Sequence, residues 1–308
     1  MPAPSATYAG VLLADWGSST LRAWRLDGAG AVAAQASFPL GVSRLAPGGA
    51  AEALDSVVRS ALGAAGLPAL LCGAIGSNVG WIDAGYVDCP ASPATVAGRL
   101  ARPAADVAIV PGLRCYGPGG PDVLRGEETQ ALGWLQGDPA RRRGARLLCL
   151  PGTHAKWLAV ADGQVVQFAS AMTGELYALL GEHSILRTVE PEAAPYDPAA
   201  FLLGIDTAGD GSAFATRLFA ARGRLLAGQF AAEAAPSYLS GLLIGAEVNS
   251  LWPAMRAEAG RVELIGDAKL TGLYATAMQR LRIPHKVWDG DAAVLCGLKT
   301  LWKMARAG

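Results

Sequence analysis

The sequence has no excess of charge of either sign. Its 308 residues include 26 lysines and arginines against 26 aspartates and glutamates, so the formal net charge at pH 7 is zero. A nucleic-acid-binding surface usually requires an excess of basic residues. The run Arg141-Arg142-Arg143 is the only dense basic patch, and a solvated linker explains it better than a nucleic-acid site. We therefore expect no nucleic-acid partner.

Cysteine and long apolar runs are both scarce. The cysteines are odd in number, scattered and without metal-type pairing, and several lie in apolar segments where a free thiol behaves as a small hydrophobe. They are Cys72, Cys89, Cys115, Cys149 and Cys296. No charged segment followed by an apolar run opens the sequence, and the longest apolar stretches contain Gly, Glu or Arg, so we expect neither a signal peptide nor a transmembrane helix. These absences favour the reducing cytoplasm and no membrane partner.

One pattern occurs twice. Residues 11–26 and residues 147–160 each read as an apolar strand, a tight glycine-containing turn rich in hydroxyl groups, and a second strand. Each copy continues through an Asp-Gly turn into a third apolar segment, at 32–38 and at 165–171. A repeated unit of this kind predicts two similar halves. The length, together with a hydrophobic content of 52%, is sufficient for about two domains.

Helices and further strands alternate after each copy of the repeat. Apolar spacing and glycine or proline boundaries predict helices at 50–62, at 127–136, at 237–251 (ending before Pro253), between Asp267 and Leu281, and at 291–304. Buried strands are expected at 69–73, 107–112, 262–265 and near 286–287, and a Pro/Gly turn at 117–121. Antiparallel strands followed by alternating strands and helices predict an α/β fold with mixed sheets flanked by helices, and ligands beyond the carboxyl ends of the strands.

The first glycine turn directly follows Asp15. A carboxylate at the end of a strand can hold hydrated Mg²⁺, which makes Asp15 a candidate metal ligand and catalytic residue. The turn offers backbone N–H and hydroxyl donors to a phosphate from Gly17, Ser18, Ser19 and Thr20. Taken alone, an Asx-type turn between two hairpin strands explains these residues as well.

The second turn supplies the matching half of a candidate phosphate site. Gly152 and Thr153 offer turn N–H groups, and Lys156 is long enough to reach a phosphate as a point charge. His154 is a further candidate, although a histidine beside a turn is more often structural. Two similar turns holding the phosphates of a nucleotide from both sides would indicate a phosphotransferase.

Another glycine turn, Gly266-Asp267, follows a buried strand and opens a helix. Glycine allows a ring or a phosphate to approach the backbone closely, so both residues are candidates for nucleotide binding. A plain strand–helix turn is an equally good explanation of this segment.

Two adjacent carboxylates begin the helix expected at 127–136. Glu127, nearer the preceding loop, is our candidate for the general base that accepts a proton from an attacking hydroxyl. Glu128 is the alternative candidate for this catalytic role. If Glu127 is the base, Glu128 would cap the helix or support its neighbour, because adjacent helical residues point in different directions. Acidic residues in a first turn also stabilise a helix through its dipole, which is the structural alternative.

These segments together resemble a known superfamily. Asp15 to Ser19 is similar to the first phosphate loop of the sugar kinase, actin and heat-shock ATPase superfamily, and Pro151 to Trp157 is similar to its second. More narrowly, the chain resembles the 2-dehydro-3-deoxygalactonokinase family over nearly its whole length. The narrower resemblance also rests on residues 76–81, 125–130, 172–176 and 240–248.

The resemblance implies a fold and an activity. It implies two ribonuclease-H-like (actin-like ATPase) domains with an interdomain cleft, divided as 1–138 and 139–308, with the last helix (about 291–304) packing back on the N-terminal domain. It implies phosphorylation of the terminal hydroxyl of 2-dehydro-3-deoxy-D-galactonate by ATP and Mg²⁺. In related sugar kinases the base is an aspartate in a Gly-Asp-Gln-like motif, whereas Gly126-Glu127 stands at the similar position here.

A sugar-acid substrate also requires partners for its carboxylate. Arg44, after Ser43, is one candidate cation and Arg125 is another, while Ser77, Asn78 and Trp81 offer a hydroxyl, an amide and an apolar wall. Alternatives remain open. They are a kinase for another sugar acid such as 2-dehydro-3-deoxygluconate, a non-catalytic actin-like ATP-binding protein, and an α/β domain that binds no nucleotide. A homodimer is also left open.

Overall fold

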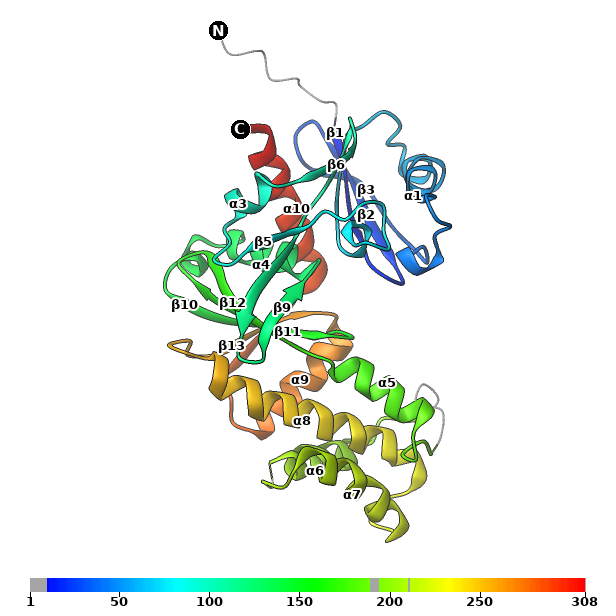
Figure 1. Ribbon diagram of the computed structural model, residues 1–308, viewed down its shortest axis with the longest axis vertical. Coiled ribbons are helices and arrows are strands. Elements are labelled where there is room, and N and C mark those ends of the chain that lie inside the picture. Colours follow the sequence, from blue (N-terminus) through cyan, green and yellow to red (C-terminus); the bar gives the residue numbers. More distant parts are fainter. Residues whose placement is uncertain (1–9, 189–193, 210, 308) are drawn as a thin grey trace. The chain divides into compact units, whose positions relative to one another are not determined.

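The computed structural model of the protein comprises two compact units (Figure 1). It describes residues 10–188, 194–209 and 211–307. Unit 1 takes its described residues from Met1–Gly144, Ala161–Gln167 and Gly290–Gly308. Unit 2 consists of Ala145–Val160 together with the described part of Phe168–Asp289.

Unit 1 contains a six-stranded mixed sheet. Its strands, in spatial order, are β3 (Val32–Phe38), β2 (Leu21–Asp27), β1 (Gly10–Trp16), β4 (Ala69–Cys72), β7 (Val107–Ile109) and β6 (Ala101–Ala104). Strand β1 is antiparallel to β2 and parallel to β4, and β4 is parallel to β7. Apolar side chains that include Leu12, Trp16, Leu54 and Leu71 form the core on one face of this sheet. The parallel pairing brings the carboxyl ends of β1 and β4 to the same edge.

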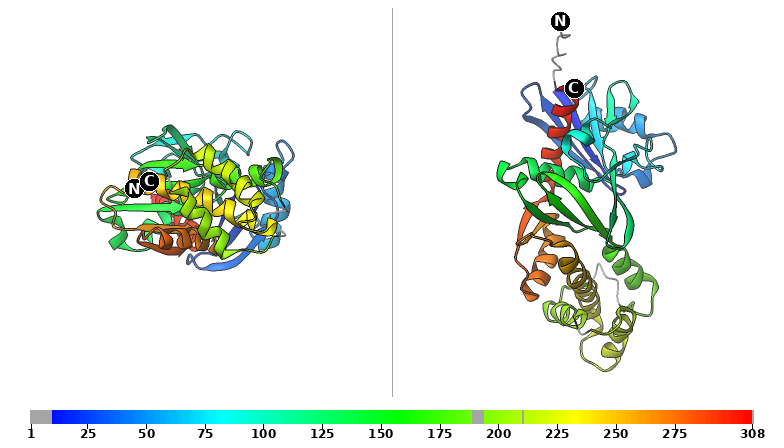
Figure 2. Two further views of the ribbon diagram at one scale, coloured as in Figure 1. Left: turned by 90° about the horizontal axis from the view of Figure 1, so that it is seen from below. Right: turned by 60° about the vertical axis from the view of Figure 1, so that its left-hand side comes forward.

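The helices of unit 1 lie close to the predicted positions. The segment 50–62 is helical throughout, as α1 (Ala50–Ala53), a π-helical stretch η2 (Leu54–Arg59) and α2 (Ser60–Leu62). The remaining helical elements are η1 (Val42–Arg44), η3 (Ala74–Gly76), α3 (Pro93–Ala97), α4 (Glu127–Gln136), η4 (Pro139–Arg142) and α10 (Gly290–Ala307). Helix α10, red in Figure 2, runs beside the blue strands of unit 1 in the right-hand view, and it contacts β1 and β4.

Helices α4 and α10 approach each other through two glycines. A Cβ atom at Gly133 would lie 1.9 Å from the carbonyl oxygen of Ala293, and one at Gly297 would lie 2.0 Å from that of Thr129. Real Cβ atoms do not approach carbonyl oxygens so closely, so neither position accepts a side chain without a shift of backbone. The last helix is therefore an integral part of unit 1.

A three-stranded sheet in unit 1 is absent from the sequence-based prediction. It comprises β5 (Tyr86–Asp88), β8 (Gly112–Gly117) and β9 (Gly120–Leu124), in that order. The Pro/Gly turn expected at 117–121 is the hairpin between β8 and β9, where Gly117 pairs with Gly120. Short strands rich in glycine and proline carry too little apolar alternation to be recognised from the sequence.

Unit 2 repeats the strand order of unit 1. Its sheet consists of β12 (Gln164–Ala171), β11 (Ala155–Ala161), β10 (Ala145–Leu150), β13 (Val262–Gly266) and β14 (His285–Asp289), of which the first residues of β12 and the last residue of β11 belong to unit 1. Strands β10, β13 and β14 are parallel. In both sheets the third, second, first and fourth strands of the half lie in that order, and a further parallel strand, β7 in unit 1 and β14 in unit 2, follows the fourth. This confirms the predicted α/β class with mixed sheets flanked by helices.

Unit 2 also contains several helices. They are α5 (Thr173–His183), α6 (Pro198–Ala208), α7 (Phe214–Leu226), η5 (Ala232–Ala234), α8 (Ala235–Met255) and α9 (Ala268–Arg280). Helix α8 continues through Pro253, so the expected end before that residue is wrong. Proline removes one backbone donor, a small loss in the last turn, where the buried Met255 still packs in the core. Within the described residues, no helix combines the length and apolar character needed to cross a bilayer.

Candidate active site

The turn after β1 is held in place by the segment that follows β3. The N–H of Gly17 donates to the carbonyl of Thr20 at 2.9 Å, which closes the turn. The backbone N–H of Ser43 donates to the carbonyl of Ser18 at 3.1 Å, and the Ser43 hydroxyl donates to the same oxygen at 2.8 Å. Ser18, Ser19 and Thr20 are exposed. Ser43 therefore supports the turn, whose hydroxyl groups face solvent.

Asp15, the last residue but one of β1, is mostly buried, with 14% of its side chain exposed. One carboxylate oxygen, Oδ2, pairs with Arg22, which also pairs with Asp291 at the start of α10. The other oxygen, Oδ1, lies 3.8 Å from the thiol of Cys72. Burial acts to lower the pKa of Arg22, but the nearby carboxylates of Asp15 and Asp291 outweigh it and raise that pKa.

The two carboxylates at the start of α4 differ in their surroundings. Glu127 is half-buried, and its Oε2 accepts the backbone N–H of Arg125 at 3.1 Å. Glu128 is fully buried; it accepts the N–H of Gly126 at 2.6 Å and the hydroxyl of Thr129 at 2.8 Å. Burial, and secondarily the charge of Glu127, raise the pKa of Glu128 to about 8. Glu128 is therefore protonated at neutral pH.

The start of α4 lies against the end of β4. Gly126, the residue before the helix, has φ 104°, and a Cβ atom there would lie 3.3 Å from the Cα of Gly73. A side chain at Gly126 would thus be strained by its conformation and crowded by Gly73. Since Asp15 pairs with Cys72 in the sheet, this contact brings the acidic start of α4 to the edge that carries Asp15.

Arg125 has an incompletely satisfied guanidinium group in unit 1. Its side chain is 8% exposed, its Nη2 donates to the carbonyl of Gly85 at 3.2 Å, and its guanidinium lies 4.6 Å from the ring centre of Tyr86. Its Nη1 is buried without a hydrogen-bond partner among the described residues, and a Cβ atom at Gly76 would lie 3.0 Å from it. A buried donor of this kind is costly unless a ligand or water satisfies it.

The other candidate substrate residues lie in two segments. Ser77 uses its hydroxyl to donate to the carbonyl of Ala74 at 2.7 Å, whereas Asn78 is exposed and Trp81 is half-buried. Arg44 is exposed and donates to the carbonyl of Pro39 at 3.0 Å. Of the two candidate cations, only Arg125 combines burial with an unmet donor.

The second glycine turn lies in unit 2 beneath the start of α5. A Cβ atom at Gly174 would lie 2.6 Å from the carbonyl oxygen of Gly152, so glycine permits this contact. The N–H of Glu175 donates to the carbonyl of Thr153 at 3.0 Å. The imidazole of His154 pairs with the Glu175 carboxylate. The turn is thus joined to the N-terminus of a helix, a position that favours anions.

Lys156 and Gly266-Asp267 occupy different surroundings. Lys156 is 6% exposed and donates to the hydroxyl of Ser170 at 2.8 Å. The carboxylate of Asp267 caps α9 by accepting from the N–H groups of Lys269 and Leu270. Gly266 faces the second turn, since a Cβ atom there would lie 3.8 Å from the carbonyl oxygen of Pro151.

A cavity of about 360 Å³ in unit 2 brings part of this set together. Two predicted residues, Gly152 and Asp267, line it, whereas Thr153, His154, Lys156 and Gly266 do not. The lining residues that sequence analysis did not propose include Thr173, Gly174, Tyr177, Ser240, Lys269 and Tyr274. Their signal is weak, because each lies within a helix or at its start, where packing explains the residue type.

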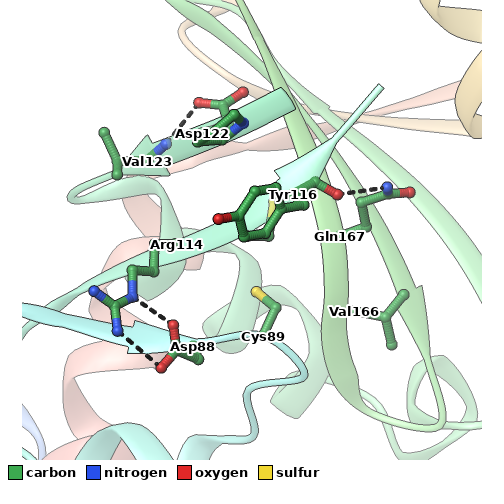
Figure 3. Close-up of a pocket in the computed structure, with 10 residues that line it drawn as sticks. Asp88, Cys89, Arg114, Tyr116, Asp122, Val123, Val166 and Gln167 are labelled. Atoms are coloured by element: carbon green, nitrogen blue, oxygen red, sulfur yellow. Dashed lines mark hydrogen bonds and ion pairs between the residues drawn. The ribbon is translucent and has the colours of Figure 1, made fainter. Parts of the chain in front are cut away.

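A larger, open cavity of about 1060 Å³ lies elsewhere in unit 1 (Figure 3). Its wall includes Arg114, whose Nη2 donates to Asp88 at 3.1 Å, and the exposed Tyr116. None of the predicted site residues lines it. The one cationic side chain among the described residues of its wall, Arg114, is already paired with Asp88, so we place the ligand site in the smaller cavity of unit 2.

The repeated strand order and the glycine turns define a protein of the actin-like ATPase fold. The activator of 2-hydroxyisocaproyl-CoA dehydratase from Clostridium difficile, a structure with bound ADPNP, matches at a TM-score of 0.50 and 14% identity, over 97% of this chain and 96% of that one. At that identity the match supports the fold alone.

Closer matches establish the family. The model of the 2-keto-3-deoxy-galactonokinase family matches residues 15–301. The 2-dehydro-3-deoxygalactonokinase of Escherichia coli (strain K12) is 33% identical over 93% of this chain and 95% of its own length. A crystal structure assigned as a 2-dehydro-3-deoxygalactonokinase from Sinorhizobium meliloti superposes with a TM-score of 0.86 at 35% identity, over 96% of this chain and 98% of that chain. The chain belongs to the 2-keto-3-deoxy-galactonokinase family and is a kinase, which implies the use of ATP and a sugar-acid substrate.

Proposed function

We propose that this protein transfers the γ-phosphoryl group of ATP to the terminal C6 hydroxyl of 2-dehydro-3-deoxy-D-galactonate, a step of galactonate breakdown. The observation that carries the proposal is the cavity in unit 2, where Gly152 and Asp267 from two separate turns meet the start of α5 at Thr173. Its volume of about 360 Å³ lies within the usual range for a small-ligand site.

The phosphate groups of ATP are assigned to the glycine turns. The N-terminus of α5, seated on Gly152 and Thr153, offers the positive end of a helix dipole to an anion. In unit 1, the hydroxyl groups of Ser18, Ser19 and Thr20 are exposed and form the matching turn. His154 lies beside the turn but is engaged with Glu175, and Lys156 is engaged with Ser170.

The residues present also fit a Mg²⁺ ion at Asp15. Magnesium in kinases usually binds one or two carboxylates together with phosphate oxygens and water. In the described part of the chain, the one hydrogen-bond donor to the Oδ1 atom of Asp15 is the weak thiol of Cys72. Within the described residues, no group of three or more His, Cys, Asp or Glu residues could enclose a metal. Asp15 would therefore hold the ion with the nucleotide, and the bound ion would neutralise phosphate charge.

Glu127 is the proposed general base. As the C6 oxygen bonds to the γ-phosphorus and the bond to ADP breaks, the hydroxyl proton passes to the Glu127 carboxylate. Its neighbour Glu128 is protonated at neutral pH and buried, so it is poorly suited to accept a proton. Glu128 instead holds the N–H of Gly126 and the hydroxyl of Thr129, which fixes the first turn of the helix.

Arg125 is the proposed partner of the substrate carboxylate. Its buried Nη1 lacks a partner among the described residues, and it lies beside the loop that carries Ser77, Asn78 and Trp81. A carboxylate would satisfy that donor with a charge-assisted hydrogen bond. Arg44 remains a second candidate, but its exposure gives it less electrostatic influence.

We also propose a cytoplasmic location and a homodimer. The five cysteines are all free thiols, which favours a reducing cytoplasm. A homodimer stays a prediction that sedimentation of the purified protein would test.

The deciding experiment is ADP release from the purified protein with Mg-ATP. It is measured without an acceptor, with 2-dehydro-3-deoxy-D-galactonate and with its gluconate epimer. Release that depends on the galactonate form supports the proposal. Equal release with both epimers would replace it with a broader sugar-acid kinase, and ATP binding without acceptor-dependent release would favour the non-catalytic alternative.

A further inference from the structure

A carboxylate that forms no ion pair among the described residues lies in the middle of helix α8. Glu247 is 6% exposed and is surrounded by the apolar residues of the unit 2 core. It accepts hydrogen bonds from the indole Nε1 of Trp157 at 2.6 Å, from the hydroxyl of Tyr274 at 2.7 Å and from the hydroxyl of Thr173. Burying a carboxylate is costly unless donors satisfy it. Three converging donors meet that requirement.

Two of the three donors come from helices that line the nucleotide cavity, and the third comes from the strand that follows the second glycine turn. Trp157 lies on β11, directly after the second glycine turn. Thr173 is the first residue of α5, and Tyr274 lies on α9, the helix that begins after Asp267. Thr173 and Tyr274 also line the cavity itself. One buried carboxylate therefore joins the second turn, the helix above it and the helix after the Gly266-Asp267 turn.

We propose that Glu247 is a positioning residue for nucleotide binding: its carboxylate fixes Thr173 at the start of α5 and Tyr274 in the middle of α9, in the arrangement that binds ATP. This proposal depends on one part of the proposed function, namely that the nucleotide binds in this cavity. Glu247 lies behind the lining residues and acts through them. A preformed site avoids the entropy cost of ordering its wall when the ligand binds.

The chemistry of the contact predicts which substitutions preserve it. Glu247→Gln keeps an oxygen for the Trp157 N–H, which can only donate, and its amide N–H₂ can donate to the hydroxyls of Thr173 and Tyr274, which can also accept. Glu247→Met keeps a similar volume but replaces the two carboxylate oxygens with a thioether sulfur, which is only a weak acceptor. Gln should therefore rescue the function that Met loses.

Unit 2 offers a matched control in Glu263. This carboxylate is 2% exposed and also accepts an indole N–H, that of Trp288 at 2.7 Å, together with the Nε of Arg261 at 2.7 Å. Neither it nor these partners line the nucleotide cavity. Glu263→Met thus perturbs an equally buried carboxylate of the same unit without touching the cavity wall.

The test is the Kd of the full-length protein for ADP, measured by calorimetry well below the unfolding midpoint of each variant, beside KM for ATP and for the sugar acid. We expect Glu247→Met to raise Kd for ADP about tenfold or more and Glu247→Gln to raise it at most about threefold, because each unmet buried donor is costly. KM for ATP should rise with Kd, while KM for the sugar acid stays unchanged. Glu263→Met should lower the unfolding midpoint and leave Kd unchanged.

Two results would overturn the proposal: an unchanged Kd in Glu247→Met, or an equal rise in Glu263→Met. If Glu247→Met does not fold, Tyr274→Phe, which keeps the ring and removes only the hydroxyl, decides the question by the same Kd, and an unchanged value counts against the proposal. Turnover is scored separately. A wild type that binds ADP but does not phosphorylate the sugar acid refutes the proposed substrate, whereas the role of Glu247 is decided by ADP binding.

Discussion

The buried carboxyl group of Glu128 makes the stability of the protein depend on pH. Its pKa is about 8 in the folded protein, against an ordinary value of 4.5. Between these two values the folded chain holds a proton that the unfolded chain releases, so the free energy of unfolding falls as pH rises. This contribution is fully present below about pH 4.5 and is lost as the pH rises through about 8.

Glu128→Gln removes this dependence while keeping the shape of the protonated group. The amide oxygen accepts the Gly126 N–H, and the amide N–H₂ donates to the Thr129 hydroxyl, which then acts as acceptor. One pH unit inside the window corresponds to about 1.4 kcal/mol. From pH 5.5 to pH 7.5, the wild type should therefore lose about 2–3 kcal/mol more stability than Glu128→Gln.

The assay is urea unfolding of both proteins at pH 5.5, 6.5 and 7.5, with the difference in unfolding free energy plotted against pH. A difference that stays constant across the three values would refute the reasoning. It would mean that the carboxyl group of Glu128 ionises in the folded protein at its ordinary pKa, despite its burial.

Three further predictions concern turnover, packing and substrate binding. Glu127→Gln should lower kcat by about 10²–10⁴ if Glu127 is the general base, and near-normal turnover would contradict that role. Gly297→Ala should destabilise the protein by about 1–3 kcal/mol or more, because the new methyl group meets the Thr129 carbonyl, and an unchanged urea midpoint would argue against the close contact of α4 and α10. Arg125→Ala should raise KM for the sugar acid more than KM for ATP. It should also raise KM for the sugar acid more than Arg44→Ala does; a larger effect of Arg44→Ala would assign the substrate carboxylate to Arg44 instead.

Much of the fold could be predicted from the sequence because its main elements have strong local signals. The third strand, at 32–38, and the helix at 127–136 have the predicted bounds. Apolar periodicity and glycine boundaries define such segments without help from the rest of the chain. The β5–β8–β9 sheet has no such signal, because its short strands are stabilised by neighbours distant in sequence.

The candidate site was harder to predict because a turn reveals its residue types but not their partners. Gly152 and Asp267 could be selected from their turns, and both line the cavity. Lys156 donates to Ser170, and one oxygen of Asp15 pairs with Arg22. Both interactions are tertiary contacts, which a turn sequence does not reveal. Glu247 did carry a signal, since a lone carboxylate in an apolar helix is rarely buried without a purpose. Its three partners could be found only in the structure.

The placement of α10 has a consequence for how the chain is made. This helix completes unit 1, although the whole of unit 2 precedes it in the sequence. During synthesis the N-terminal strands emerge early, yet the surface that α10 covers stays open until residues 290–307 have left the ribosome. A stop codon that removed residues 290–307 would therefore damage unit 1, most of which is made before unit 2. Newly made N-terminal halves should depend on chaperones for as long as unit 2 is being translated.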